Sequence, residues 1–350
     1  MTVIPLLAGL ALPPHAQAQV PAPTLVPTAA RDLTLVLRPG GWEAGLRDIY
    51  AQPFAAATGI GIRTEPRWDG RIETLRAQLK ANEAGWDILL IPAATLAAGC
   101  EEGLLEKLDW PAIGGKEHYL PQAVSECGVG AFVAATVLAW DRDKFPATPG
   151  WAEFWDVAKL PGKRGLFRGP RGTLEFALLA DGVAPGDIYR QLRSAEGVER
   201  TFRRLDQLRP FITWWENEAQ AAQMLSSGDV LMASAPFGQV AAANQLQGRN
   251  FGVQWAGALA RVQYWAIAKG SPNPRQAQQF LYFAGTAAIQ ARLPAYGGMA
   301  KGVAELLGAE AQAGLASAPA NLAAMVPADE AFWRENAEKL AQRFEAWLAR

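Results

Sequence analysis

The stretch that decides the fold is residues 128–145, GVGAFVAATVLAWDRDKF. Its core, residues 131–140, carries no charge and contains Val, Thr and aromatic side chains. It is too short to cross a bilayer, which requires about 20 apolar residues, and it fits a strand that is buried on both faces. Because strands and helices alternate before it and start to alternate afresh after it, we expect it to leave one α/β lobe and enter a second.

A similar uncharged run, residues 262–268 (VQYWAIA), follows much later and is predicted to be a second crossing strand. Two lobes joined by two such strands form a hinged cleft, so the cleft is expected to hold the function. This pattern predicts discontinuous lobes, with residues 31–136 plus 266–325 in lobe 1 and residues 138–262 in lobe 2. The last helix, residues 328–349, places apolar side chains on one face and should pack across the lobes.

The composition excludes several classes of function. The net charge of −1 and the pI near 6.2 give no electrostatic sign of nucleic-acid binding. The chain has no GxSxG motif, and its two His and two Cys leave little from which to build a metal site. Carboxylates such as Glu43, Asp69, Glu175 and Glu216 could be paired for glycoside hydrolysis, but no spacing singles out a pair. We therefore expect no enzyme activity, no cofactor and no metal.

The N-terminus has the features of a secretory signal in residues 1–18. Residues 3–12 form a short apolar core, and Ala16-Gln17-Ala18 is a small-x-small cleavage pattern. A basic segment before the core is missing, which leaves open the true start of the chain and a plain apolar N-terminus as the alternative. Residues 19–30 are rich in Pro and Ala and are predicted to be a tether. The mature protein is expected to be soluble and periplasmic.

Export changes the interpretation of the cysteines. Cys100 and Cys127 are the only two in the chain, and an oxidising compartment would allow them to form a disulfide. Closing the loop between them would contribute roughly 3.5 kcal/mol in the chain-entropy model. Two separate buried thiols are the alternative.

Candidate binding residues follow the carboxyl ends of the predicted strands, because open α/β sheets bind ligands there. After the first strand, a Gly-Gly bend lets the backbone approach a ligand, and Trp42 forms either a cleft wall or a packed turn. The loop of residues 169–173 (GPRGT) could hold an anion or be a structural turn. The predicted ligand-binding residues are Gly41, Trp42, Glu43, Trp68, Asp69, Arg171, Trp215, Glu216, Phe237, Gln263 and Tyr264.

From about residue 33 to residue 350, the chain resembles the periplasmic substrate-binding proteins of spermidine/putrescine ABC importers. The segments that carry the resemblance are GGWEAGLRDIYAQPFAAATGI, WDILLIPAATLAAGCEEGLLEKLDW, FPATPGWAEFWDVAKLPGKRGLFRGPRGTLEFALLADGV, WWENEAQAAQMLSSGDV and YWAIAKGSPN. The resemblance implies the two-lobe periplasmic binding protein fold of type II, in which each lobe is a mostly parallel sheet flanked by helices. It also implies a monomer that delivers a small molecule to a membrane permease and catalyses no reaction.

The resemblance implies a polyamine as the ligand, which needs aromatic walls for its methylenes and carboxylates for its ammonium ends. Members of that family place an acid just before the aromatic pair of the second crossing strand, where this chain has Gln263 before Tyr264. The loop after the first strand of lobe 2 contains Arg168 and Arg171 and no acid. An amino acid-like zwitterion or an anion is therefore the alternative ligand, and a periplasmic sensor is the alternative role.

Overall fold

The computed structural model describes residues 32–37, 45–65, 68–80, 85–293, 297–308, 311 and 313–350. The predicted signal and tether lie outside the described residues. The chain from Asp32 to Arg350 forms one compact unit. Within the described part of the chain, no helix combines the length and the apolar character needed to span a membrane.

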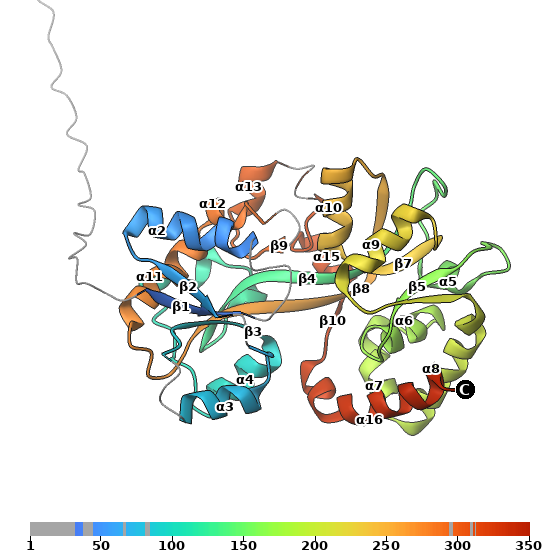
Figure 1. The fold of residues 1–350 in the computed structure, drawn as a ribbon, viewed down its shortest axis with the longest axis horizontal. Helices are drawn as coiled ribbons and strands as arrows, with labels where there is room; N and C mark the ends of the chain where they lie inside the picture. The colour runs from blue at the N-terminus through green and yellow to red at the C-terminus, as the bar shows by residue number, and fades with distance from the viewer. Residues whose placement is uncertain are drawn as a thin grey trace, which may run out of the picture. The chain divides into compact units, whose positions relative to one another are not determined.

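One mixed sheet with the strand order β2-β1-β3-β8-β4-β7-β5-β6 runs through this unit, as Figure 1 shows, and β10 and β9 pair with β8 and β4 off this path. The strands are β1 (Leu33–Val36), β2 (Ile62–Glu65), β3 (Ile88–Pro92), β4 (Gly128–Asp141), β5 (Arg164–Phe167), β6 (Ile212–Trp215), β7 (Met232–Pro236), β8 (Phe251–Ile267), β9 (Gly297–Gly298) and β10 (Val326–Pro327).

The sheet has two parallel parts separated by two long antiparallel strands. In the first half, β1 pairs in parallel with β2 and β3, and in the second half β5 pairs in parallel with β6 and β7. Strands β4 and β8 run antiparallel between them. Strand β3 pairs with residues 263–267 of β8, and β7 pairs with residues 136–140 of β4. The long strands thus belong to both halves, which confirms the strand predicted at residues 131–140.

The second long strand is longer than expected. The sequence analysis placed a crossing strand at residues 262–268, whereas β8 is continuous from Phe251 to Ile267. Gly257 has a φ of 73°, a backbone conformation that favours glycine, so the strand continues through an irregular turn of the chain. Its pairing with β4 shifts register between Thr136 and Leu138 at this place.

Helices flank the sheet in both halves (Figure 1). They are α2 (Gln52–Thr58), α3 (Ile72–Lys80), α4 (Ala93–Glu101), α5 (Trp151–Trp155), α6 (Thr173–Ala180), α7 (Ile188–Leu192), α8 (Ala195–Leu208), α9 (Glu218–Ser227), α10 (Phe237–Gln247), α11 (Pro274–Ala284), α12 (Ala287–Gln290), α13 (Val303–Leu307), α15 (Pro319–Ala324) and α16 (Glu330–Leu348). Shorter helical turns are the π-helix η1 (Arg47–Ala51) and the 3-10 turns η2 (Pro111–Ile113), η3 (Lys116–His118), η4 (Pro121–Ala123), η5 (Pro185–Asp187) and η6 (Arg209–Phe211).

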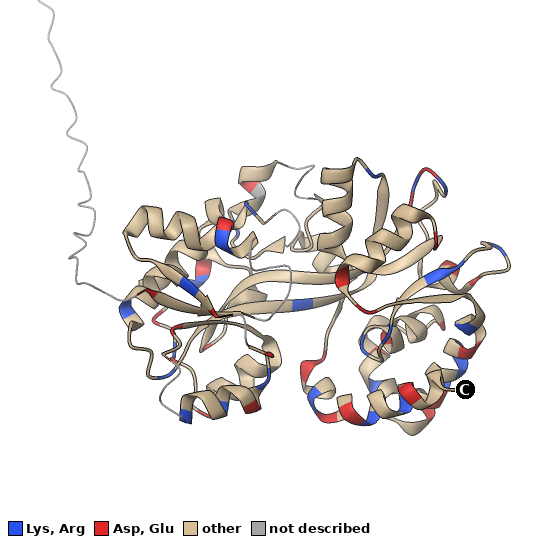
Figure 2. Ribbon diagram, in the orientation of Figure 1, with Lys and Arg blue, Asp and Glu red and all other residues tan. Residues whose placement is uncertain are grey.

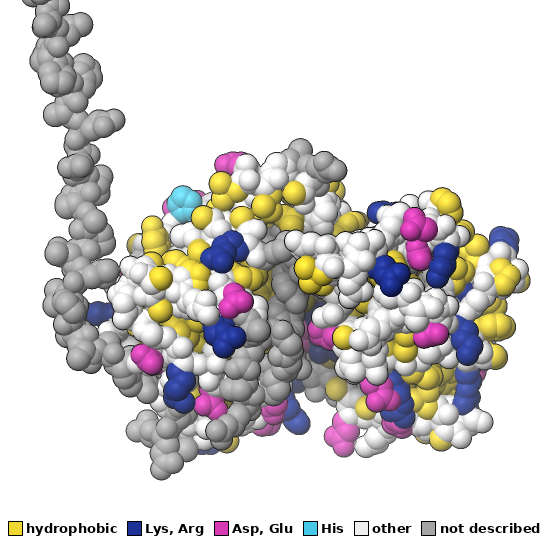
Figure 3. Space-filling view, turned by 45° about the horizontal axis from the view of Figure 1, so that its top comes forward, with side chains coloured by type: hydrophobic (Ala, Val, Ile, Leu, Met, Phe, Trp, Pro, Cys, Tyr) yellow, Lys and Arg dark blue, Asp and Glu magenta, His cyan; other side chains and the backbone are white. Residues whose placement is uncertain are grey.

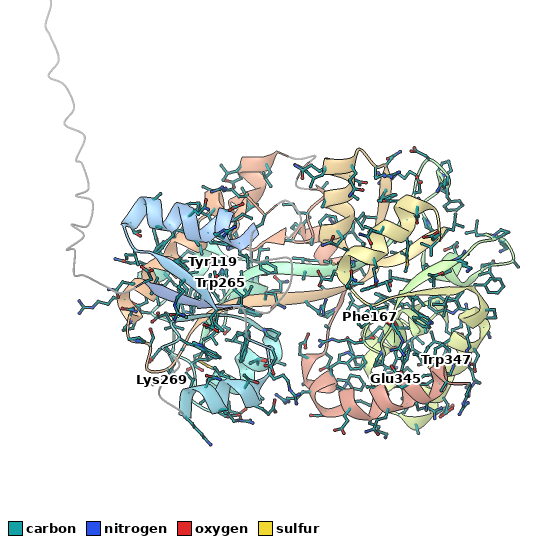
Figure 4. All side chains as sticks on the ribbon, in the orientation of Figure 1. Tyr119, Phe167, Trp265, Lys269, Glu345 and Trp347 are labelled. Carbon is teal, nitrogen blue, oxygen red and sulfur yellow. A yellow bond between two sulfur atoms is a disulfide. The ribbon has the colours of Figure 1, made fainter. Side chains whose placement is uncertain are left out.

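The C-terminal helix α16 packs on the second half through aromatic side chains. The ring centroids of Phe344 and Trp214 lie 5.7 Å apart, and the Trp347 indole donates a hydrogen bond of 2.6 Å to Asp206. Figure 4 labels Trp347 near the C-terminal end of this helix. Its other contacts include helix α4 of the first half. The lobe boundaries, and a role for this helix across both lobes, stay predictions.

Cys100 and Cys127 form a disulfide with their Cα atoms 5.7 Å apart, which confirms the predicted pair. The bond joins the last turn of α4 to the residue that precedes β4. It therefore links α4, the helix that follows β3, to the start of the long strand β4.

Candidate functional site

The carboxyl ends of β3 and β7 point toward each other along β8. Strand β3 runs antiparallel to β8 and ends at Pro92, opposite Gln263. Strand β7 ends at Pro236, which lies level with Leu259 of β8 across the intervening β4. The two strands therefore approach from opposite directions and stop on either side of residues 260–262. Open α/β sheets bind ligands at the carboxyl ends of their strands, so this is where both halves would contribute to one site.

The part of β8 between the two strand ends is only partly buried. Residues 260–264 are all half-exposed, whereas the neighbouring Leu259 and Trp265 are only 2% and 1% exposed. In Figure 3 the lower outline of the molecule is notched between the first half and the second. We use the name central recess for residues 260–264 of β8 together with Pro92 and Pro236.

Arg261 lies in the central recess. Because side chains alternate along a strand, Arg261 and Gln263 share one face of β8, and Trp265 continues that face. Trp265 packs edge-on against Tyr50 of η1, with ring centroids 5.3 Å apart. Arg261 is the only Lys or Arg in β8. The two long strands between the halves are mostly uncharged, as Figure 2 shows. The sequence analysis selected Gln263 and missed Arg261. The two-residue periodicity of a strand could have identified Arg261, because residues 261 and 263 share a face.

The two arginines of the loop after β5 are already paired with acids. Arg171 forms an ion pair with Glu330 in the first turn of α16. Arg168 donates hydrogen bonds of 3.0 and 2.9 Å to the carboxylate of Glu345, and its Nε lies 3.6 Å from Glu216. Figure 4 labels Glu345 on α16, and Phe167 at the end of β5 above it in this view. A ligand anion at this loop would have to compete with carboxylates of the protein itself.

Trp68 and Asp69 follow β2 as predicted, but both are engaged in the packing of α3. Trp68 is 0% exposed, and its ring packs edge-on against Trp86 at 5.7 Å, so it offers no surface to a ligand in this structure. Asp69 accepts hydrogen bonds from the backbone N–H of Arg71 (2.9 Å) and from the hydroxyl of Thr74 (2.8 Å). Their part in ligand binding stays a prediction.

Trp215 and Phe237 are also largely buried. The indole of Trp215 donates a hydrogen bond of 3.3 Å to the hydroxyl of Ser234 on β7. Phe237 is the first residue of α10, and its ring centroid lies 4.8 Å from that of Trp255 on β8. Both side chains therefore pack beside the carboxyl end of β7, in the second half.

The remaining predicted residues differ in what the structure shows. Gly41, Trp42 and Glu43 lie outside the described residues. Tyr264 is half-buried on β8 and donates a hydrogen bond of 2.8 Å to the carbonyl oxygen of Gln122. Burial raises the pKa of Tyr264, so its hydroxyl stays protonated at neutral pH and keeps this bond.

Glu175, which the sequence analysis considered among the carboxylates for hydrolysis, is fully buried and structural. Its carboxylate accepts hydrogen bonds from the Gly172 backbone N–H (2.8 Å), the Tyr189 hydroxyl (3.0 Å) and the Trp333 indole (2.7 Å). Burial raises the pKa of Glu175 above its ordinary value, because a charge is poorly solvated there. The residue ties together α6, α7 and α16.

Two other hollows lie away from the strand ends. One is lined by α8 and α16, among them Phe202, Arg343 and Trp347, and the other by residues 108–117. In the described ranges, no three His, Cys, Asp or Glu side chains are grouped so that they could hold a metal ion. Each of the two hollows is lined by one half only, whereas strand ends from both halves flank the central recess.

Comparison with known proteins identifies the family. The family model described as bacterial extracellular solute-binding protein matches residues 50–333. The chain belongs to this family. A relative from Pseudomonas aeruginosa, named gamma-aminobutyric acid-binding protein, is 40% identical over 349 residues, which cover 98% of this chain and 96% of the relative.

Two solved structures are similar over nearly the whole chain. The ABC transporter substrate-binding protein from Bradyrhizobium japonicum USDA 110 is 31% identical with a TM-score of 0.77, covering 91% of this chain and 99% of that one. The Atu4243-GABA receptor is 28% identical with a TM-score of 0.77, covering 91% and 97%. The fold is thus the periplasmic binding protein fold of type II, as predicted, and this family member is an extracytoplasmic solute-binding protein of an ABC transporter. Polyamine specificity has no support from these relatives.

Proposed function

We propose that this solute-binding protein captures a small zwitterion, with an ammonium group at one end and a carboxylate at the other, in the central recess. Gamma-aminobutyrate (GABA) is the ligand class, because it is named for a relative that is 40% identical over nearly the full length. The loaded protein then delivers the ligand to the membrane permease of an ABC importer. The convergence of the strand ends of β3 and β7 on residues 260–262 is the observation that carries the binding role.

The residues of the central recess support a ligand with a carboxylate over a polyamine. Gln263 is neutral and Arg261 is cationic, so neither can neutralise an ammonium end. A guanidinium has five N–H donors and can hold a ligand carboxylate beside a partner from the protein itself. A diamine would instead bring a second positive charge next to Arg261. The alternative ligand of the sequence analysis, an amino acid-like zwitterion, therefore replaces the polyamine.

A thermal-shift panel tests this function. A ligand that binds only the folded state adds about 2.7 kcal/mol of stability at 100 times its dissociation constant. We expect GABA to raise the unfolding midpoint, whereas putrescine and spermidine at equal concentration leave it nearly unchanged. Butyrate and butylamine, each lacking one end of GABA, serve as controls and should act weakly. A panel in which only the polyamines raise the midpoint would overturn the proposal.

A further inference from the structure

We propose that Arg261 binds the carboxylate end of the ligand and is the residue that selects an ω-amino acid over a diamine. This inference rests on the proposed function and adds the residue that reads the ligand's charge. Arg261 is not among the binding residues expected from the sequence. Those residues follow strand ends or, like Gln263 and Tyr264, lie at the aromatic pair of β8.

The position of Arg261 follows from the register of the sheet. Residue 261 pairs with Ala134 of β4, between the level of Gln263, where β3 ends, and the level of Leu259, where β7 ends. From Gln263 onward β8 pairs with β3, and at Leu259 and Ala260 it pairs with β10. Strand β7 lies across β4, level with residues 252–259 of β8. A half-buried arginine at the midpoint is therefore within reach of both halves of the fold.

Two arginines near the strand ends of the second half form ion pairs with the C-terminal helix. Arg171 and Arg168 are each paired with a carboxylate of α16, from Glu330 and Glu345 respectively. Binding of a ligand carboxylate by either one would first require an ion pair to be broken, with an acid left behind beside the ligand. Arg261 lies on a different element, at the centre of the sheet. It too has an interaction within the protein, but its guanidinium has five N–H donors and can hold a ligand carboxylate beside that partner.

The elements that begin at the two strand ends add a bias in the same direction. Helix α4 starts at Ala93, directly after Pro92, and α10 starts at Phe237, directly after Pro236. Neither helix start has a side-chain hydrogen bond from its N-cap residue. The positive ends of both helix dipoles are therefore next to the strand ends that flank Arg261, which disfavours a second cation there and favours a carboxylate.

The test compares two ligands that differ only at the carboxylate: GABA and its neutral amide, 4-aminobutanamide. We expect Arg261→Met to weaken GABA binding by at least about 30-fold, which is the lower end for the loss of a buried charge partner. Binding of the amide should change by less than about threefold, so that the preference for GABA over the amide largely disappears. Calorimetric titration measures both affinities. A matched control, Arg249→Met, removes an exposed arginine just before β8 and should leave both affinities unchanged.

A second variant covers the case in which Arg261→Met does not fold. Arg261→Lys keeps the charge but loses the bidentate geometry, and it should weaken GABA binding by about tenfold or more. Unchanged GABA affinity and unchanged discrimination in either folded variant would overturn the role of Arg261 while leaving the proposed function intact. A wild-type protein that binds neither GABA nor any other ω-amino acid would instead overturn the proposed function.

Discussion

Replacing Glu175 with alanine should lower the free energy of unfolding by about 3 kcal/mol or more. The carboxylate accepts hydrogen bonds from Gly172, Tyr189 and Trp333, which belong to the N-cap of α6 and to α7 and α16. Removing it leaves three donors in a buried place without their acceptor, and each such donor costs about 1–3 kcal/mol. Urea denaturation measures the effect, with the exposed Glu335→Ala of α16 as the control, which should change stability by less than about 0.5 kcal/mol.

The pH dependence of the free energy of unfolding provides an independent test of the buried position of Glu175. Burial raises the folded-state pKa of Glu175 above its ordinary value of 4.5. As the pH rises from 4.5 toward the raised folded-state pKa, the unfolded chain releases the proton and the folded chain keeps it, so the wild-type protein loses stability. Glu175→Gln has no proton to release. The unfolding free energy of the Gln variant minus that of the wild type should therefore grow with rising pH, and a difference that shrinks would show that burial does not dominate.

Removal of the disulfide should lower the free energy of unfolding by roughly 3–4 kcal/mol. Cys100 and Cys127 are separated by 27 positions, and closing a loop of this length restricts the unfolded chain. The chain-entropy model gives roughly 3.5 kcal/mol for such a loop. Denaturation of a Cys100→Ala/Cys127→Ala variant beside the wild type measures the loss.

Reduction of the wild-type protein provides the matched control for the disulfide. A reducing agent should bring the stability of the wild type close to that of the double variant, and it should leave the double variant unchanged. Thiol titration of the denatured, unreduced wild-type protein from the periplasm should find no free thiol. Two free thiols per chain would refute the pairing.

The sequence could predict the crossing strands because their physical requirement is local. An uncharged run such as residues 131–140 needs burial on both faces, and its length excludes a membrane span. The pairing register of these strands could not be predicted from the local sequence. Whether Arg261 lies between the ends of β3 and β7 depends on pairings between segments that are far apart in the chain, and a shift of one residue would turn its side chain to the other face.

The candidate site was harder to predict because position after a strand does not fix the direction of a side chain. Trp68 and Trp215 were expected to form cleft walls, yet the structure turns both into the packed interior. The loop of Arg171 could have held an anion or been a structural turn, and the sequence could not decide between them. The partner of Arg171, Glu330, comes from the C-terminal helix, which the sequence pattern described only by its apolar face. The composition of a loop cannot show which distant carboxylate pairs with an arginine in that loop.

The central claim is that the recess binds a zwitterion and rejects a diamine of the same length. Calorimetric titration of the wild-type protein with GABA and with putrescine tests it directly, because putrescine replaces the carboxylate of GABA with an aminomethyl group and keeps the other end. We predict that one GABA binds per chain and that putrescine binds at least about 100-fold more weakly, since a charge-assisted pair is exchanged for a contact between like charges. Putrescine binding as tightly as GABA, or more tightly, would contradict the account.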